Sequence, residues 1–320
     1  MSRSVWIRRL FTGDAWVDDA LLTIDRESGI ILSLSSPSPM PEEENSAIQC
    51  IHCCAAPALI DLQIYGAGGQ LFSLYPTVET LKLMYEHCLQ GGTAYFQPTI
   101  ASNAVSVIVA GIEAVREYWE AGGKGCLGLH LEGPWISLAK RGAHLPEHIQ
   151  EWPSFAAVQT LLERGRGIIT FVTLAPEIIS PPLMAYLATR KEDITFSLGH
   201  SNATYEQAMD ALATGTLRCA THLFNAMSPL HHRQPGCIAA ICNTPQPVYA
   251  SIIADGWHVA WPMLSVAQRL LPTRLFLITD AVTATNTGPY PHQLSAGGDR
   301  YESAGVLSGS ALTLWQAEIG

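Results

Sequence analysis

The sequence is poor in positive charge. Lysine and arginine number 18 among 320 residues, against 28 aspartates and glutamates, and the formal net charge is −10. Lysine and arginine never occur more than two in a row. Proteins that bind nucleic acids gather such cations on one surface to neutralise phosphates. We therefore expect no nucleic acid partner, although a few cations inside a pocket would suffice to bind a small anionic substrate.

Long apolar runs are missing as well. No window approaches the roughly 18 continuous apolar residues that a membrane-spanning helix needs. The N-terminus, "MSRSVWIRRLFTGDAW", lacks the apolar core of a signal peptide. We therefore expect no membrane partner and no export, and we predict a cytoplasmic protein.

The eight cysteines are scattered, at positions 50, 53, 54, 88, 126, 219, 237 and 242. A large enzyme-like chain without an export signal keeps its thiols reduced. The "CIHCC" run resembles half of a zinc site, but no second pair follows at a suitable spacing. We interpret these cysteines as structural thiols.

Residues 1–55 predict a small β domain. The stretch "AWVDDALLTIDRESGIILSLSS" holds two apolar runs separated by a Glu-Ser-Gly turn, which is typical of a hairpin. The following "SPSPMPEEENS" is acidic, rich in proline and without periodicity, and it indicates a surface loop.

Residues 56–320 show a different pattern, in which short apolar runs alternate with amphipathic stretches. The apolar runs are "ALIDLQI", "AYFQPTI", "CLGLHLE", "IITFVTLA", "ITFSLGH", "LRCATHLF", "YASIIADGWH" and "LFLITDA". Nearly continuous apolar strands indicate burial on both faces, as in a parallel sheet covered by helices. Eight such units over about 250 residues predict an α/β fold, the (β/α)8 TIM-type barrel.

Polar residues gather at the ends of these runs. They are Asp61, Gln63, Gln97, Glu132, His200, His222, His258 and Asp280. In (β/α)8 barrels the C-terminal ends of the strands carry the active site. Histidines and carboxylates with purely structural roles would instead be scattered among helices and loops. We assign no function to the histidines outside this pattern, which are His52, His87, His148 and His292.

Glu132, His200 and His222 together suit a metal site. Zinc accepts imidazole nitrogen and carboxylate oxygen, and a catalytic zinc site keeps one position open. Singly, a buried histidine is more often a hydrogen-bonded core residue, and Glu132 could pair with an arginine. At three strand ends of one barrel, we interpret them as metal ligands. His130 lies two residues before Glu132 on the same side of the strand, and we favour a supporting or core role over a ligand role for it.

Asp280 ends an otherwise apolar strand, where an unpaired carboxylate is costly. Beside a metal site it can serve as general base and then as general acid. The alternative is a buried aspartate that caps neighbouring loop amides.

Several motifs carry a family resemblance. They are "PALIDLQIYGAGG", "GLHLEGPWIS", "GAH", "SLGHSNATYEQA", "THLFNAMSPLHHRQPG", "IIADGWHV", "LITDAV" and "LSGSALT". Their order from about Pro57 to Thr313 resembles that of the N-acetylglucosamine-6-phosphate deacetylases of the amidohydrolase superfamily. The resemblance implies hydrolysis of the acetamide of an amino-sugar 6-phosphate. It also implies a barrel joined to a small β-sandwich built from both chain ends, and a homodimer.

The resemblance also assigns roles to residues. It implies one divalent ion, zinc first with iron or cobalt also suitable, on Glu132, His200 and His222, with Asp280 as acid and base. Many superfamily members hold two metals through His-x-His on the first strand and a carboxylated lysine on the fourth. Here the first strand reads Asp61-Leu62-Gln63 and "IITFVTLA" has no lysine, which favours one ion.

The implied substrate contacts lie in several loops. His144 would polarise the acetyl carbonyl, with Ala143 and Gln63 in the same region. Arg233, from either subunit, and His258 would bind the phosphate, because an arginine fork matches phosphate oxygens. The other implied contacts are Asn225 and Ala226 to the sugar or phosphate, and Leu307, Ser308 and Gly309 on the acetyl side.

Two departures from the family pattern leave alternatives open. Tyr65 stands where the family usually has asparagine. The chain ends at "LTLWQAEIG", so we expect a C-terminally shortened protein whose last barrel helix is incomplete and whose β domain lacks its C-terminal strands. An inactive remnant that at most binds sugar phosphate is one alternative. A cyclic amide hydrolase of the same superfamily is the other.

Overall fold

The computed structural model describes residues 1–36, 48–149, 154–285, 287–288, 290–294, 300–303 and 306–311, without the side chains of residues 48–53, 303, 306 and 307. The predicted loop after the first hairpin lies almost entirely outside these ranges. The predicted last helix lies entirely outside them. The chain divides into two compact units, Met1–Ala58 and Leu59–Gly320. The cysteines whose side chains are described are free thiols.

The first unit is a four-stranded sheet in the order β3-β2-β1-β4. Its strands are β1 (Ser2–Phe11), β2 (Trp16–Asp25), β3 (Ile31–Ser35) and β4 (Ile48–Ala55). The predicted hairpin joins β2 to β3, and the Asp25 carboxylate accepts hydrogen bonds from Glu27 N and Ser28 N in its turn. The sheet confirms the predicted N-terminal β domain.

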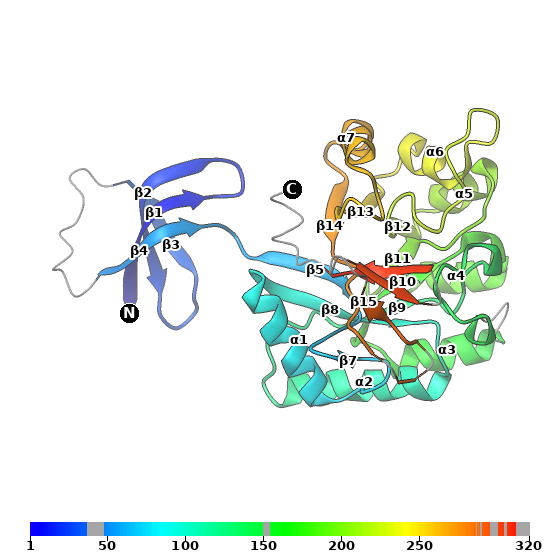
Figure 1. Ribbon diagram of the computed structural model, residues 1–320, viewed down its shortest axis with the longest axis horizontal. Coiled ribbons are helices and arrows are strands. Elements are labelled where there is room, and N and C mark those ends of the chain that lie inside the picture. Colours follow the sequence, from blue (N-terminus) through cyan, green and yellow to red (C-terminus); the bar gives the residue numbers. More distant parts are fainter. Residues whose placement is uncertain are drawn as a thin grey trace. The chain divides into compact units, whose positions relative to one another are not determined.

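The second unit holds eight parallel strands that are neighbours in chain order (Figure 1). They are β5 (Leu59–Ile64), β8 (Thr93–Ala101), β9 (Leu129–Glu132), β10 (Ile169–Leu174), β11 (Thr195–Leu198), β12 (Leu217–Ala220), β13 (Tyr249–Ile253) and β14 (Leu275–Ile278). The helices that follow them are α1 (Val78–Gln90), α2 (Val105–Glu120), α3 (Phe155–Arg164), α4 (Pro181–Ala188), α5 (Tyr205–Ala213), α6 (Gly236–Asn243) and α7 (Trp261–Leu270). This confirms the (β/α)8 barrel. Among the described helices, none combines the length and the apolar character that crossing a bilayer requires.

The barrel closes between its first and last strands. Ile64 and Ala281 form a parallel bridge. Tyr65 N donates to Ala281 O over 2.8 Å, and Asp280 N donates to Gln63 O over 3.0 Å. Beyond this seam, β15 (Gln293–Leu294), β16 (Arg300–Ser303) and β17 (Val306–Ser310) form a small antiparallel sheet, and Ser310 forms a bridge with Ala281. Short segments β6 (Gly66–Ala67) and β7 (Gln70–Leu71) form a hairpin after β5.

Asp61 is buried beside this seam and makes the stability of the barrel depend on pH. Its carboxylate accepts hydrogen bonds from Gln63 N and from Thr279 N and Oγ1. Burial raises the pKa of Asp61 to about 6, and the hydrogen bonds from Thr279 and Gln63 act in the opposite direction. The folded chain therefore keeps this proton at a pH where an unfolded aspartate has lost it.

We expect Asp61→Asn to remove a fall in stability between about pH 4 and pH 6. In that window the folded wild type binds the proton more tightly than the unfolded chain, so its free energy of unfolding decreases as pH rises, by about 3 kcal/mol in total. Asparagine cannot ionise and still offers Oδ1 to the two backbone donors. Urea unfolding of both metal-free proteins from pH 4 to pH 7 measures the difference. Parallel curves would contradict the prediction, and the exposed Asp14→Asn serves as the control.

Candidate active site

A cavity of about 170 Å³ opens among the loops that follow the barrel strands. It is lined by Tyr65, Leu71, Ser73, Ala101, Glu132, Gly142, Ala143, His144, His200, His222, Asn225, Ala226, His258, Asp280, Val282, Tyr290, His292 and Ser308. Most of the polar residues expected at strand ends therefore face one space.

Three ligand atoms meet in this cavity. Glu132 Oε1 lies 3.2 Å from His200 Nε2 and 3.0 Å from His222 Nε2, and the two imidazole nitrogens are 3.0 Å apart. Ligands of one tetrahedral zinc ion, each about 2.0–2.1 Å from it, lie roughly 3.3 Å from one another. The three atoms thus have close to the spacing that one small divalent ion requires.

The hydrogen bonds of His200 fix which of its nitrogens can bind a metal. His200 Nδ1 lies 2.8 Å from Lys140 O, and a carbonyl oxygen only accepts. Nδ1 is therefore protonated, and in the neutral ring Nε2 presents a lone pair to Glu132 and His222. A cation satisfies this set of facing acceptors, so the donor set fits a divalent metal. Nδ1 of His222 has no hydrogen-bond partner within the described part of the chain.

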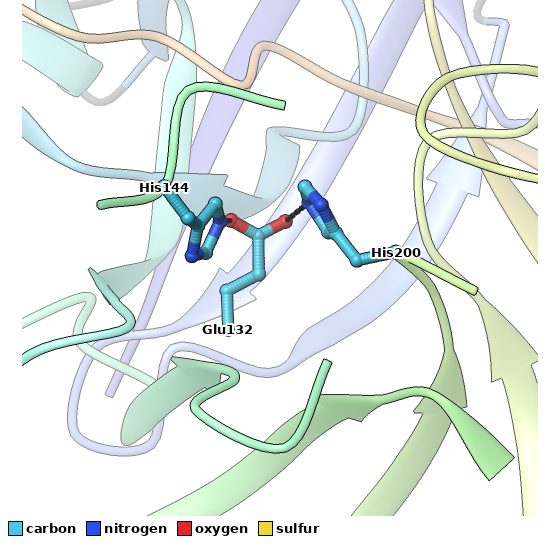
Figure 2. A group of neighbouring side chains, drawn as sticks. All are labelled: Glu132, His144 and His200. Carbon is cyan, nitrogen blue, oxygen red and sulfur yellow. Dashed lines mark hydrogen bonds and ion pairs between the residues drawn. The ribbon is translucent and has the colours of Figure 1, made fainter. Parts of the chain in front are cut away.

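His144 has the opposite tautomer. Ser102 N donates to His144 Nδ1 over 3.2 Å, and Ser102 Oγ lies 2.8 Å from the same nitrogen. In the neutral ring the proton is therefore on Nε2, which lies 2.9 Å from Glu132 Oε2. Figure 2 shows His144 and His200 at opposite oxygens of Glu132. Although Glu132, His144 and His200 are close enough to hold an ion, His144 offers an N–H donor and His200 a lone pair.

Glu132 is ionised despite its burial. Burial raises its pKa. Without an ion, the charge of His200 and hydrogen bonds from His144, His200 and His222 outweigh burial and hold the pKa well below its usual value, and a bound cation would replace the protons on the two imidazole nitrogens that face Glu132 Oε1. The carboxylate thus supplies the negative charge that a divalent cation needs.

Asp280 is connected to Glu132 through one side chain. Gln63 Nε2 lies 2.6 Å from Asp280 Oδ1 and 2.9 Å from Glu132 Oε1. Burial raises the pKa of Asp280 to about 7. The charge of His222 lowers it, and the carboxylates of Glu132, Asp61 and Asp255 raise it further. Asp280 is therefore a carboxyl group whose protonation can change near neutral pH.

The backbone is strained where it turns these side chains into the cavity. His200, His222 and Asp280 have φ angles of 47°, 37° and 53°, in the left-handed region that residues other than glycine seldom adopt. Each follows the last residue of its strand by two positions. Such strain is maintained by the surrounding structure and is common at functional sites.

Comparison with known proteins identifies the family of this chain. No family model matches the chain. The N-acetylglucosamine-6-phosphate deacetylase of Haemophilus influenzae is 33% identical over 267 residues, 81% of this chain and 68% of the relative. The N-acetylgalactosamine-6-phosphate deacetylase of a Shewanella species is 35% identical, over 81% of this chain and 66% of the relative. The chain belongs to the N-acetylglucosamine-6-phosphate deacetylase family. These alignments span about two thirds of each relative's length.

Solved structures of family members agree with the whole described fold. An N-acetylglucosamine-6-phosphate deacetylase variant from Mycobacterium smegmatis, in complex with N-acetyl-D-glucosamine-6-phosphate, gives a TM-score of 0.85 at 26% identity, covering 99% of this chain and 82% of that one. The deacetylase from Pasteurella multocida gives 0.84 at 29% identity, covering 99% and 83%.

Not every residue that the deacetylase resemblance assigned to the substrate lines the cavity. Gln63 is buried between Glu132 and Asp280 and is not among the lining residues. Arg233 is exposed and lines a second cavity of about 580 Å³. Leu307 lies in β17, and its side chain is outside the described part. Gly309 approaches Asp280 closely, because a Cβ at this position would lie 2.8 Å from Asp280 O.

The remaining expected contacts of the deacetylase family line the cavity. They are Ala143, His144, Asn225, Ala226, His258 and Ser308. His258 Nδ1 lies 2.6 Å from Asp255 Oδ2, which orients its ring. His130 is different, because its two nitrogens contact Thr173 Oγ1 at 2.8 Å and Leu62 O at 3.2 Å inside the barrel. His130 is therefore a core residue, as favoured over a ligand role.

Sequence reasoning missed three residues of the site. His292 received no function, yet it lines the cavity with Nδ1 at 2.9 Å from Ser308 Oγ. Ser102 fixes the tautomer of His144, and Tyr290 donates to Ser102 O over 2.6 Å. His292 lies outside the pattern of polar strand ends, and its neighbours in space are distant in sequence, so no local signal identifies it.

Proposed function

We propose that the protein removes the acetyl group from an N-acetyl amino-sugar 6-phosphate, giving acetate and the amino-sugar 6-phosphate, with N-acetylglucosamine 6-phosphate as the first candidate substrate. The observation that carries the proposal is the meeting of Glu132 Oε1, His200 Nε2 and His222 Nε2 within 3.2 Å of one another. The names of the relatives support the substrate class.

Glu132, His200 and His222 would hold one divalent ion, zinc in this proposal. Two imidazoles and one carboxylate with an open position suit catalytic zinc; iron and cobalt accept similar ligands. When bound, such an ion supplies Lewis-acid chemistry, in which it lowers the pKa of a water molecule and polarises a carbonyl oxygen.

The residues around this site have complementary proton roles. Ionised Asp280 accepts the proton of the attacking water and later delivers it to the departing amine nitrogen, which leaves neutral. The Nε2–H of His144 lies 2.9 Å from Glu132 Oε2 without substrate, and in this proposal it turns to the acetyl oxygen and stabilises the negative charge that develops there. Ser102 holds that N–H in place by occupying Nδ1.

The other contacts bind and orient the sugar phosphate. His258, held by Asp255, faces the cavity and contacts the phosphate in this proposal. Arg233 would reach the phosphate of a partner subunit in a homodimer, since it is exposed on its own chain. Ala143, Asn225, Ala226 and Ser308 contact the acetamide and sugar. The homodimer and the cytoplasmic location stay predictions.

Acetate release tests the proposal directly. The purified protein is analysed for bound metals, then assayed with N-acetylglucosamine 6-phosphate and N-acetylgalactosamine 6-phosphate, with and without a chelator. We expect acetate from at least one epimer, loss of activity after chelation and recovery when zinc is added. Metal without activity on either epimer, but with activity on a cyclic amide, would favour a cyclic amide hydrolase. Neither metal nor acetate would favour a remnant.

A further inference from the structure

Tyr65 lies where β5 ends and contacts the same carboxylate as the histidines. Its hydroxyl is 2.5 Å from Glu132 Oε2 and 2.8 Å from Gln63 Nε2. Its ring lines the cavity and packs in the apolar cluster that includes Leu71, Val282 and Tyr290. None of the substrate-binding and catalytic roles proposed above involves this hydroxyl.

The direction of these hydrogen bonds follows from the groups involved. The carboxylate of Glu132 is ionised and only accepts, so the Tyr65 hydroxyl donates to Oε2. The amide of Gln63 is a donor at Nε2, so the hydroxyl oxygen accepts from it. A phenol carries its proton at neutral pH, so the hydroxyl has one hydrogen to donate.

The two oxygens of Glu132 therefore have different surroundings. Oε2 accepts from the hydroxyl of Tyr65 and from Nε2 of His144. Oε1 lies within 3.2 Å of the nitrogens of His200 and His222 and 2.9 Å from Gln63 Nε2. The two hydrogen bonds to Oε2 restrict rotation of the carboxylate and keep Oε1 directed at the imidazoles. Figure 2 shows His144 at one oxygen of Glu132 and His200 at the other.

We propose that Tyr65 is a positioning residue that holds Glu132 as a one-oxygen metal ligand and thereby favours a small ion with nitrogen ligands over hard cations. Calcium and similar cations take many oxygen ligands, including both oxygens of one carboxylate, whereas zinc is satisfied by four ligands. Partners that orient a ligand in this way typically change metal affinity by about 10–100-fold. The inference rests on the metal site of the proposed function.

Tyr65→Phe tests the inference through metal affinity. The variant keeps the packed ring and removes the hydroxyl. After chelator treatment, the dissociation constants for zinc and manganese are measured by competition with a chromogenic chelator. We expect the zinc constant to rise about 10–100-fold and the manganese constant to rise less, so that the preference for zinc falls. Unchanged constants for both ions would overturn the inference.

A matched control separates this role from a packing role. Tyr118 is buried in α2, and its hydroxyl donates to Lys124 O over 2.7 Å, in a different part of the barrel. Tyr118→Phe loses a similar hydrogen bond and is expected to lower thermal stability without changing either constant. Wild-type protein that binds no metal would overturn the metal site and the proposed function together. If the wild type binds metal and Tyr65→Phe has the same dissociation constants, this inference alone is overturned.

The wild-type protein provides a second test that needs no variant. Cobalt(II) with three protein ligands and one water is four-coordinate and absorbs visible light strongly, whereas six-coordinate cobalt absorbs weakly. We expect the strong spectrum for the wild type, because Oε2 of Glu132 is engaged by Tyr65. The weak spectrum would overturn the inference even if Tyr65→Phe failed to fold.

Discussion

Asp280→Asn is expected to lower the rate of acetate release by a factor of about 10²–10⁴, the usual contribution of a positioned acid–base group, while metal content stays unchanged. Asparagine has nearly the same shape as aspartate. Asparagine tolerates the left-handed backbone that Asp280 adopts with φ of 53°. Its Oδ1 can still accept from Gln63 Nε2, now 2.6 Å from the aspartate. What it loses is the ability to take and return a proton.

Two measurements decide this prediction. Turnover is followed as acetate, and metal content is measured on the same samples. Wild-type turnover in the variant would exclude Asp280 as the acid–base group. A variant that had lost its metal would instead show that Asp280 acts in binding the ion.

The wild-type enzyme should also show an acidic limb in its rate profile. Asp280 accepts a proton only when ionised, so activity falls as pH drops through its pKa. Burial raises that pKa to about 7 in the metal-free chain. A nearby divalent cation favours the carboxylate, so the limb of the loaded enzyme should lie below pH 7.

The second large effect is expected for Glu132→Gln. The substitution removes the negative charge among the three ligands and places an amide where two imidazole nitrogens and two donors converge. We expect metal affinity to fall at least about 100-fold, since a ligand is lost rather than one of its supports, and acetate release to fall with it.

Thermal unfolding measures the loss independently of activity. An ion at 100 times its dissociation constant stabilises the folded wild type by about 2.7 kcal/mol, and the variant should gain almost nothing at the same concentration. Glu177→Gln is the matched control, because Glu177 accepts from Ser201 Oγ and Asn202 N and contacts none of the ligands. A full metal-dependent gain in Glu132→Gln would contradict the ligand role.

The sequence predicted the parts of the site that strands position. Glu132 is the last residue of β9, and His200, His222 and Asp280 follow the ends of β11, β12 and β14. Parallel strands of one barrel bring such ends together, so their meeting follows from hydrophobic periodicity and strand order.

The parts that the sequence did not predict depend on contacts between loops. Gln63 was expected beside the acetamide, yet its amide joins two carboxylates beneath the cavity. His292 and Ser308 meet through the small sheet after β14. No local pattern encodes these contacts, because they depend on how far each loop folds back over the barrel. Tyr65 was recognised only as a departure from the family, and its hydrogen bonds became visible in the structure.

The left-handed backbone at His200, His222 and Asp280 implies that the barrel could be more stable than it is. Each such conformation costs on the order of 1–3 kcal/mol, and glycine would relieve it without disturbing the strands. A selection for heat resistance that ignored catalysis should therefore yield glycine at these three positions among its substitutions. The resulting proteins would be more stable but inactive. The increase in their free energy of unfolding would measure how much stability the active site costs the barrel.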